Sequence, residues 1–333
     1  MRAAVCASHG LPESVTVQQV PVPALSAGQV RVQVDFAAVN FPDVLVVANE
    51  YQVKVPTPFI PGSEFAGIVS EVGGKDVGFA IGDRVMGTGL FGAFAAEVVT
   101  ETRSLSHVPD GIDTRLAAAA GVAYRTAYHS LRSVARVEPG DSIVVLGGGG
   151  GVGLAAVGLG TALGAEVIAV ASSQEKLDAA KQYGATGLIN HREADLRTSL
   201  KALLPRGAAA VIDPVGGSLS EPALRSLCRG GRFVTIGFAS GAIPRIPLNL
   251  VLVKGIQILG FQFGDIAADE FTRNEAELRE LLGSGQVVPH VGAEFPLDEA
   301  AQALRTVADG RAIGKVLIRV RGPEGLDPGT PHE

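Results

Sequence analysis

The pattern of hydrophobic positions changes part-way along the chain. Up to about residue 120, apolar residues gather in short strand-like runs between glycines and prolines, namely AAVCAS, VTVQQV, QVRVQVDFAAVN, AGIVSEVG, DRVMGTG and AAEVVT. Runs of this kind predict a compact, antiparallel, barrel-like domain that is mainly β. From residue 113 the spacing becomes helical in DTRLAAAAGVAYRTAYHSLRSV, with Asp113 or Thr114 as the expected N-cap. We therefore expect the first domain to end near residue 123.

Between residues 141 and 262, apolar strands take turns with helix-length segments. The expected strands are SIVVL, EVIAVA, GLIN, AAVID, GRFVTIG and IQILGFQ, and the expected helices span 151–164, 174–183, 194–204 and 218–228. Apolar strands separated by helices indicate parallel pairing with helices on both faces. The pattern predicts an α/β fold with a doubly wound parallel sheet.

The C-terminal part of the chain contains two more helical segments, DEFTRNEAELRELLGSG and LDEAAQALRTVADG, and a final strand, KVLIRV. Because these are too few to bury a core of their own, we expect residues 263–321 to join residues 1–123 in one split domain. Residues 124–262 then form the central domain. Residues 322–333 are rich in proline, glycine and acidic residues, which predicts a mobile tail.

Composition and charge exclude several classes of protein. The 333 residues include 28 basic and 34 acidic side chains, for a net charge of −6, with no run of Lys or Arg, so we expect no nucleic-acid partner. Cys6 and Cys228 are too far apart in sequence for a CxxC metal knuckle and fit a reducing compartment. The N-terminus lacks the apolar core of a signal peptide, so we expect a cytoplasmic location.

One uncharged stretch, from Ile143 to Ala165, is long enough to span a bilayer. Nine of its residues are glycines, concentrated near its start, and such a density breaks a membrane-spanning helix. The alternative is a buried strand, a glycine turn and a buried helix. We therefore expect no membrane association.

The run of five glycines from Gly147 to Gly151 is the first chemical motif. Gly148, Gly150 and Gly153 fit G-x-G-x-x-G between a strand and a helix, the pattern of a dinucleotide site. We assign the tight turn to the first glycine, the approach of the pyrophosphate to the second, and close packing of helix and strand to the third, with the helix N-terminus favouring negative charge. The alternative is a merely flexible turn.

The end of the next strand indicates which dinucleotide binds. NAD sites commonly carry Asp or Glu about 20 residues after the first glycine, whereas this chain has Ser172 and Ser173 there, followed by Lys176. Hydroxyls and a cation suit the 2′-phosphate of NADPH, which a carboxylate would repel. Ser172 and Glu175 also fit a capping box for the next helix, so Ser172 could serve only as a cap. We predict NADPH rather than NADH.

Several motifs together resemble a known family. AAVNFPDVL, PFIPGSEFAGIV, GDRVMG, GGGGVGLAA, IDPVGG and GKVLI occur in the order and spacing of the medium-chain dehydrogenase/reductase superfamily, in its zinc-free quinone oxidoreductase (zeta-crystallin-like) branch. The resemblance extends to about residue 320. It implies a GroES-like catalytic domain split around a Rossmann domain, use of NADPH, and a homodimer.

The resemblance also bears on metal binding and on the substrate. Asn40 and Ser63 stand where the zinc alcohol dehydrogenases of the superfamily have a Cys and a His ligand. The scattered histidines and cysteines do not supply the three or so ligands that a catalytic zinc needs, so we predict no metal. Without that Lewis acid, the expected substrates are acceptors that take hydride readily: quinones, α,β-unsaturated carbonyls or enoyl thioesters.

Matching the motifs gives the candidate catalytic residues. Asn40, Asp43 and Tyr51 resemble the polar pocket group of zinc-free members, and Thr126 resembles the threonine near the nicotinamide. Tyr51 could hydrogen-bond the substrate oxygen or supply a proton, and Asn40 could steady the developing oxyanion. The structural alternatives are a turn Asn, a helix-capping Asp, a partly packed loop Tyr and an ordinary helical Thr. Glu64 aligns with a superfamily glutamate whose role without zinc could be purely structural.

The remaining candidates concern the cofactor. Arg192 follows His191, where the family often has a Tyr that encloses the adenosine phosphate, and Arg192 could pair with that phosphate or be a solvated charge. Arg125 replaces a small residue near the nicotinamide and could narrow the pocket or favour an anionic substrate. The other candidate cofactor-binding residues are Gly151, Val152, Gly237 and Phe238.

These observations predict an NADPH-dependent reductase that passes hydride from nicotinamide C4 to a quinone or an enone. No G-x-S-x-G motif supports a hydrolase. Two alternatives stay open: a reductase of enoyl thioesters or other activated alkenes, and a cofactor-binding protein with a mainly structural or interaction role.

Overall fold

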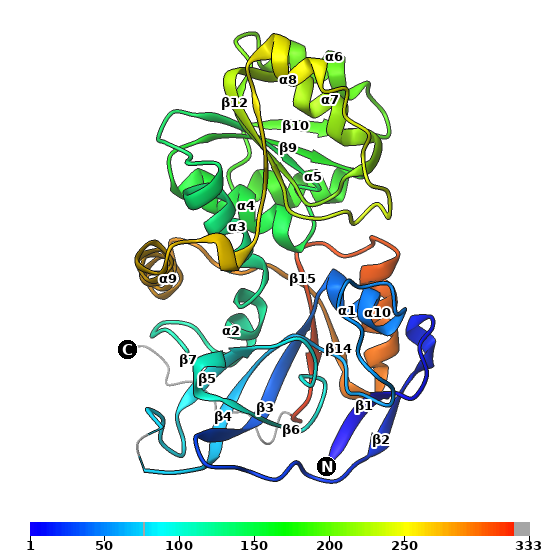
Figure 1. Ribbon diagram of the computed structural model, residues 1–333, viewed down its shortest axis with the longest axis vertical. Coiled ribbons are helices and arrows are strands. Elements are labelled where there is room, and N and C mark those ends of the chain that lie inside the picture. Colours follow the sequence, from blue (N-terminus) through cyan, green and yellow to red (C-terminus); the bar gives the residue numbers. More distant parts are fainter. Residues whose placement is uncertain (76, 323–333) are drawn as a thin grey trace. The chain divides into compact units, whose positions relative to one another are not determined.

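The computed structural model describes residues 1–75 and 77–322, and its secondary-structure elements are labelled in Figure 1 where there is room. The chain forms two compact units. The first consists of Met1–Val122 and the chain from Val288 onward, and the second consists of Ala123–Val287. All but the first residue of the expected tail, 322–333, lies outside the described residues.

The first unit is built on a mainly antiparallel sheet in the order β14-β15-β3-β4-β5-β7, with β6 also paired to β3. The N-terminal strands β1 and β2 form a separate antiparallel ladder. The strands are β1 (Arg2–Cys6), β2 (Val15–Gln19), β3 (Gln29–Val39), β4 (Glu64–Val72), β5 (Arg84–Thr88), β6 (Glu97–Glu101), β7 (Leu105–His107), β14 (Val291–Pro296) and β15 (Lys315–Arg319). The helices are α1 (Phe41–Val47), α2 (Thr114–Ala120) and α10 (Ala300–Ala308). Asp113 is the N-cap of α2, where its side chain accepts a hydrogen bond from the N–H of Leu116.

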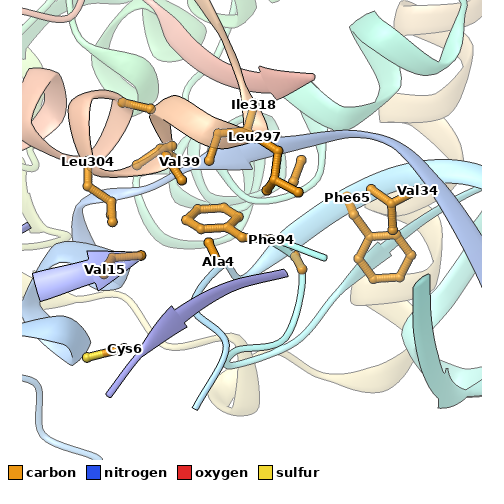
Figure 2. Packing of buried hydrophobic residues seen from close by; sticks show 14 of the residues in the cluster. Ala4, Cys6, Val15, Val34, Val39, Phe65, Phe94, Leu297, Leu304 and Ile318 are labelled. Carbon is orange, nitrogen blue, oxygen red and sulfur yellow. The ribbon is translucent and has the colours of Figure 1, made fainter. Parts of the chain in front are cut away.

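The hydrophobic core of the first unit joins segments from both ends of the chain. Figure 2 shows Ala4 and Phe94 from the N-terminal part beside Leu297, Leu304 and Ile318 from the C-terminal part. All five side chains are buried. Because the burial of apolar surface is the main favourable term in folding, the C-terminal segment is an integral part of this unit.

The second unit is a six-stranded parallel sheet in the order β10-β9-β8-β11-β12-β13. The strands are β8 (Ser142–Leu146), β9 (Glu166–Ala171), β10 (Gly187–Asn190), β11 (Ala208–Asp213), β12 (Leu227–Thr235) and β13 (Gln257–Gly260). The helices are α3 (Ala123–His129), α4 (Gly151–Ala162), α5 (Gln174–Gln182), α6 (Leu196–Leu203), α7 (Ser220–Arg225), α8 (Asn249–Lys254) and α9 (Ala268–Gly283). This order is the 3-2-1-4-5-6 arrangement of dinucleotide-binding sheets, and it confirms the predicted α/β doubly wound class.

The uncharged stretch that could have spanned a membrane is strand β8, a glycine turn and helix α4. Among the described residues, no helix has both the length and the apolar character needed to cross a bilayer.

The structure differs from the sequence-based expectation at two boundaries. The helix expected over 218–228 is only α7, because Leu227 already pairs with Ala208 as the start of β12. Helix α9, which we expected in the first unit, belongs to the second, so the first unit resumes at Val288 rather than at residue 263. Contacts with α3 hold α9 in the second unit: Glu275 of α9 accepts a hydrogen bond from the ring of His129 in α3 at 2.8 Å, and Phe271 of α9 stacks on the same ring.

Candidate functional site

The glycine turn between β8 and α4 is the first group of candidate residues in the second unit. Gly147 has a φ of +63°, so the left-handed residue of the tight turn is Gly147 and not Gly148, the glycine to which we had assigned the turn. Gly148 instead lies against β9, where a Cβ would be 2.9 Å from the Cβ of Ala169. At Gly153 a Cβ would lie 2.0 Å from the carbonyl oxygen of Gly147, so only glycine lets helix α4 pack on the turn.

Gly150 differs from its neighbours because the protein itself leaves room for a side chain there. It is the N-cap of α4 with an extended backbone, and a Cβ would meet nothing closer than the Gly147 oxygen at 3.5 Å. Gly151 and Val152 follow in the first turn of α4 and are half-buried. The N-terminus of a 12-residue helix attracts an anion through its backbone N–H groups and its dipole.

Three basic side chains gather beside this turn. A Cβ at Gly149 would lie 2.4 Å from the Cβ of Lys176, so Lys176 stands directly against the glycines. Burial lowers the pKa of Lys176, and the positive charge of Arg192 lowers it further. Burial and the same Arg192 charge lower the pKa of His191. This like-charge crowding is what a bound phosphate would relieve.

The serines at the end of β9 have different positions. Ser173 is the N-cap of α5, and its Oγ accepts a hydrogen bond from the N–H of Lys176 at 3.4 Å. The capping role that we had considered for Ser172 is therefore wrong. Ser172 lies between β9 and this cap and is half-buried.

The loops after β11 and β12 complete this edge of the sheet. Asp213 ends β11, and its Oδ1 accepts hydrogen bonds from the N–H groups of Val215 and Gly216, both at 2.8 Å. Gly237 follows β12 and donates its N–H to the Asp213 carbonyl at 3.4 Å, and a Cβ at Gly216 would lie 2.8 Å from the ring of Phe238. Carboxyl ends of parallel strands share one edge, where open α/β sheets bind their ligands.

Thr126 and Arg125 lie on helix α3 of the second unit. Thr126 is buried. The Nε of Arg125 donates to the Glu275 carboxylate at 2.9 Å, and its guanidinium lies over the ring of Phe263, 5.5 Å from the ring centroid. The charge of Arg125 is thus engaged within this unit, which disfavours the idea that it attracts an anionic substrate.

The first unit carries its own group of candidate residues, which begins at helix α1. Asn40 is the N-cap of α1, and its backbone N–H donates to Oδ2 of Asp43 at 2.7 Å. Burial raises the pKa of Asp43 to about 7, although the Asn40 N–H, the Ser63 hydroxyl and the Lys315 charge each lower it. Asp43 Oδ1 is buried and has no hydrogen-bond partner among the described residues.

The side chain of Asn40 lies at the centre of a buried polar network. Its Nδ2 donates to Ser63 Oγ at 3.1 Å and to Glu64 Oε1 at 2.8 Å, and its Oδ1 accepts from Lys315 Nζ at 2.6 Å. Lys315 also forms an ion pair with Glu64. Glu64 Oε2 accepts from the N–H of Val122 at 2.6 Å.

Strand register explains why these residues meet. Strands β15, β3 and β4 are neighbours, with Val316 opposite Val39 and Ala38 opposite Glu64. Lys315 at the start of β15 and Glu64 at the start of β4 therefore flank the end of β3, where Asn40 follows. Among the described residues, no side-chain hydrogen bond joins Tyr51 to this network, and Tyr51 is half-buried against the hydrophobic core.

Two family models match the chain: "alcohol dehydrogenase GroES-like domain" over residues 26–110 and "zinc-binding dehydrogenase" over residues 151–282. A quinone oxidoreductase-like protein 2 from Mus musculus is 36% identical over 325 residues, which are 96% of this chain and 92% of that protein. The quinone oxidoreductase of Mus musculus is 31% identical over 324 residues, with 96% and 97% covered. The chain belongs to the quinone oxidoreductase family.

A solved structure of the same family agrees with the fold. The crystal structure of Escherichia coli quinone oxidoreductase in complex with NADPH has a TM-score of 0.88 and 27% sequence identity, and the match covers 96% of this chain and 100% of that one. These findings confirm the predicted place in the medium-chain dehydrogenase/reductase superfamily, with a GroES-like unit and a parallel-sheet unit. They establish the chain as an oxidoreductase.

One family model is named for zinc, so we tested whether the Asn40 network fits that ion. Zinc takes thiolate, imidazole and carboxylate ligands. Here the two matching positions carry an amide and a hydroxyl, and the amide oxygen already accepts from the Lys315 ammonium. Among the residues that the structure describes, no group of three or more His, Cys, Asp or Glu side chains could hold a metal ion. The donor set does not fit zinc.

Three of this oxidoreductase's candidate residues were not predicted from the sequence. Ser63 was considered only as a lost zinc position, Lys315 only as part of the GKVLI motif, and Asp213 only as part of IDPVGG. A signal for Lys315 was present in the sequence: a lysine at the start of an apolar strand needs a partner when that strand is buried.

Proposed function

We propose that this chain is an NADPH-dependent, zinc-independent quinone oxidoreductase that reduces quinones or α,β-unsaturated carbonyls by hydride transfer. The observation that carries the cofactor assignment is the contact of Lys176 with the glycine turn, with Arg192 close by and serines where an acid would select NADH. The NADPH complex of the Escherichia coli relative supports the same choice.

The residues of the second unit would bind and orient this cofactor. Helix α4 presents its N-terminus to the pyrophosphate, with Gly150 leaving room for its approach. Lys176 and Arg192 would hold the 2′-phosphate through charge-assisted hydrogen bonds. Thr126 would contact the nicotinamide end, from which the bound cofactor supplies hydride.

The residues of the first unit would act on the acceptor. Hydride adds to a carbon of the quinone or enone, its electron pair moves charge onto the carbonyl oxygen, and a proton then completes the reduction. Tyr51 and Asp43 are the candidate proton donors near that oxygen, and Asn40 organises the pocket around it. Positioning and oxyanion stabilisation, rather than a covalent nucleophile, account for the catalysis.

Stopped-flow oxidation of NADPH against a benzoquinone, an enone and an acyl thioester tests this function. We expect rapid oxidation with the quinone or the enone. Preference for the thioester would favour the alternative of an enoyl-thioester or activated-alkene reductase. Binding of NADPH with no turnover of any acceptor would favour a cofactor-binding protein with a structural or interaction role.

We also propose a homodimer formed through the edge of the parallel sheet. Strand β13 is the outermost strand on its side, and the preceding helix α8 carries Leu252 and Val253, which are 83% and 72% exposed. Leu248, immediately before α8, is 76% exposed. An exposed apolar cluster beside an open strand edge is typical of an interface, and a second copy would cover both at once.

A further inference from the structure

The Asn40 network ends in the Ser63 hydroxyl, which also lies toward the Asp43 carboxyl. Lys315 and Glu64 are almost completely buried, with side chains that are 3% and 1% exposed. The Lys315 ammonium faces Asn40 Oδ1, the Glu64 carboxylate and, at 3.5 Å, the carbonyl oxygen of Val39. An ammonium has three hydrogens, so these contacts occupy all of them, and Lys315 has none left for a substrate.

The ammonium determines the orientation of the Asn40 amide. Because Lys315 can only donate, the amide must turn its oxygen toward Lys315 and its nitrogen toward Glu64 and Ser63. The two hydrogens on Nδ2 are then both used. Asn40 could contact a substrate oxygen directly, as the sequence suggested, only by breaking one of these bonds.

Ser63 is the half-buried end of this chain of hydrogen bonds. Its Oγ accepts from Asn40, and its own O–H lies toward the Asp43 carboxyl, whose pKa it lowers. Burial favours the protonated form of Asp43, and in that form the carboxyl no longer needs the Ser63 hydrogen, which is then available as a donor. The backbone on both sides of Ser63 is fixed. The Ser63 carbonyl accepts a hydrogen bond from the N–H of Gly89 at 2.8 Å. Gly62, with a φ of +100°, packs so closely on the Phe94 ring that a Cβ there would be 2.3 Å from it. A donor held this firmly costs little reorganisation during a reaction.

From this geometry we infer that the Ser63 hydroxyl donates a hydrogen bond to the carbonyl oxygen of the acceptor, with Asn40, Lys315 and Glu64 as its positioning residues. The inference deepens the proposed reductase function and rests on it. The ammonium polarises the amide, the amide donates to Ser63, and each bond in such a chain strengthens the next. The influence of a buried cation thus reaches the substrate oxygen through two hydrogen bonds.

The first test compares Ser63→Ala with Ser70→Ala, the same change on strand β4, where Ser70 Oγ donates only to the Arg31 carbonyl. Loss of one oxyanion donor typically lowers kcat about 10²- to 10³-fold. We expect that loss in Ser63→Ala with an unchanged NADPH Kd, and none in Ser70→Ala. Equal kcat values for the two variants would overturn the inference.

The second test asks whether Lys315 acts through Ser63. Removing Lys315 alone leaves the Glu64 charge buried and unpaired, so we use the neutral pair Glu64→Gln/Lys315→Met. We expect the pair to lower kcat in the wild-type background and to have little further effect when Ser63→Ala is already present. Additive losses would show that the pair acts elsewhere and would overturn the positioning role.

A third measurement does not depend on turnover. If the wild-type chain reduces no acceptor, the proposed function fails. The orientation of Asn40 can still be measured by NMR of its side-chain amide. The amide signal is assigned by its loss in Asn40→Asp. We expect amide protons that exchange slowly with solvent in the wild type and quickly in the neutral pair. Fast exchange in the wild type would contradict the network itself.

Discussion

Replacement of Gly150 or Gly153 by alanine should affect different properties of the protein, namely NADPH binding and stability, respectively. At Gly153 the new Cβ would lie 2.0 Å from a backbone oxygen, where real Cβ atoms essentially never come within 3.0 Å. Helix α4 would have to move away from the turn by about an ångström. Overpacking of this kind costs about 1–3 kcal/mol. Because the atom in the way belongs to the backbone and cannot rotate aside, we expect a cost near the upper end of this range.

The gain in helix propensity offsets only part of that cost. Alanine is better than glycine inside a helix by about 1 kcal/mol, so Gly153→Ala should lower the free energy of unfolding of the second unit by about 2 kcal/mol. At Gly150 the nearest atom is 3.5 Å away, which is ordinary contact. Loss of glycine at this N-cap should cost less than about 1 kcal/mol, but the alanine Cβ would enter the space through which we propose that the pyrophosphate approaches.

Urea denaturation followed by circular dichroism and titration of NADPH fluorescence separate the two effects. The chain has no tryptophan, so protein emission near the NADPH signal is low. We expect Gly150→Ala to keep nearly its full stability and bind NADPH at least ten-fold more weakly, a loss of about 1.4 kcal/mol or more. Normal NADPH binding by Gly150→Ala, or equal loss of stability in both variants, would refute this division of roles.

Three further predictions address the cofactor, the buried carboxyl and the dimer. Lys176→Ala should weaken NADPH binding by about 1.5–3 kcal/mol and leave NADH binding nearly unchanged. As a control, replacement of Lys181, an exposed lysine on the same helix, by alanine should affect the binding of neither cofactor. Equal losses of affinity for both cofactors in Lys176→Ala would contradict the 2′-phosphate assignment. Because the pKa of Asp43 rises from 3.8 to about 7 on folding, its contribution to stability is present below pH 4 and is lost as the pH rises to 7, by an amount on the order of 4 kcal/mol. The Tm of Asp43→Asn relative to wild type should therefore increase between pH 5 and pH 8. The nearby charges of Lys315 and Glu64 act in opposite directions, because the first lowers the pKa of Asp43 and the second raises it. A Tm difference that stays constant with pH would show that Asp43 is ionised throughout. Leu252→Asp should convert the proposed dimer to a monomer in light scattering, while Leu203→Asp, at a 47% exposed position on α6, should not.

The sequence predicted those parts of the fold that depend on local pattern. The alternation from β8 to β13 followed from apolar runs of strand length, and the glycine motif placed the start of α4 at Gly151. It could not show which glycine takes the left-handed backbone, because a run of five gives several equivalent registers. The choice of Gly147 depends on how closely Gly148 and Gly153 approach their neighbours.

The polar network of the first unit depends on contacts between distant parts of the chain, which a local sequence pattern does not contain. Asn40 and Asp43 were found because they belong to one motif, whereas the partnership of Asn40 with Lys315 spans 275 positions and exists only through the pairing of β15 with β3. Helix α9 was misplaced for a similar reason. Its amphipathic pattern predicts a buried face but not the unit that covers that face, which is decided by partners such as His129.

The buried pair of Glu64 and Lys315 has a consequence for synthesis on the ribosome. The two residues are 251 positions apart, and at about 5–20 residues per second translation needs roughly 10–50 s to pass from one to the other. During that interval Glu64 has no cation to bury with, and burying it alone would be strongly unfavourable. The buried network of Asn40, Glu64 and Lys315 therefore cannot form until the sequence of the second unit has been synthesised, and it is among the last parts of the new chain to form.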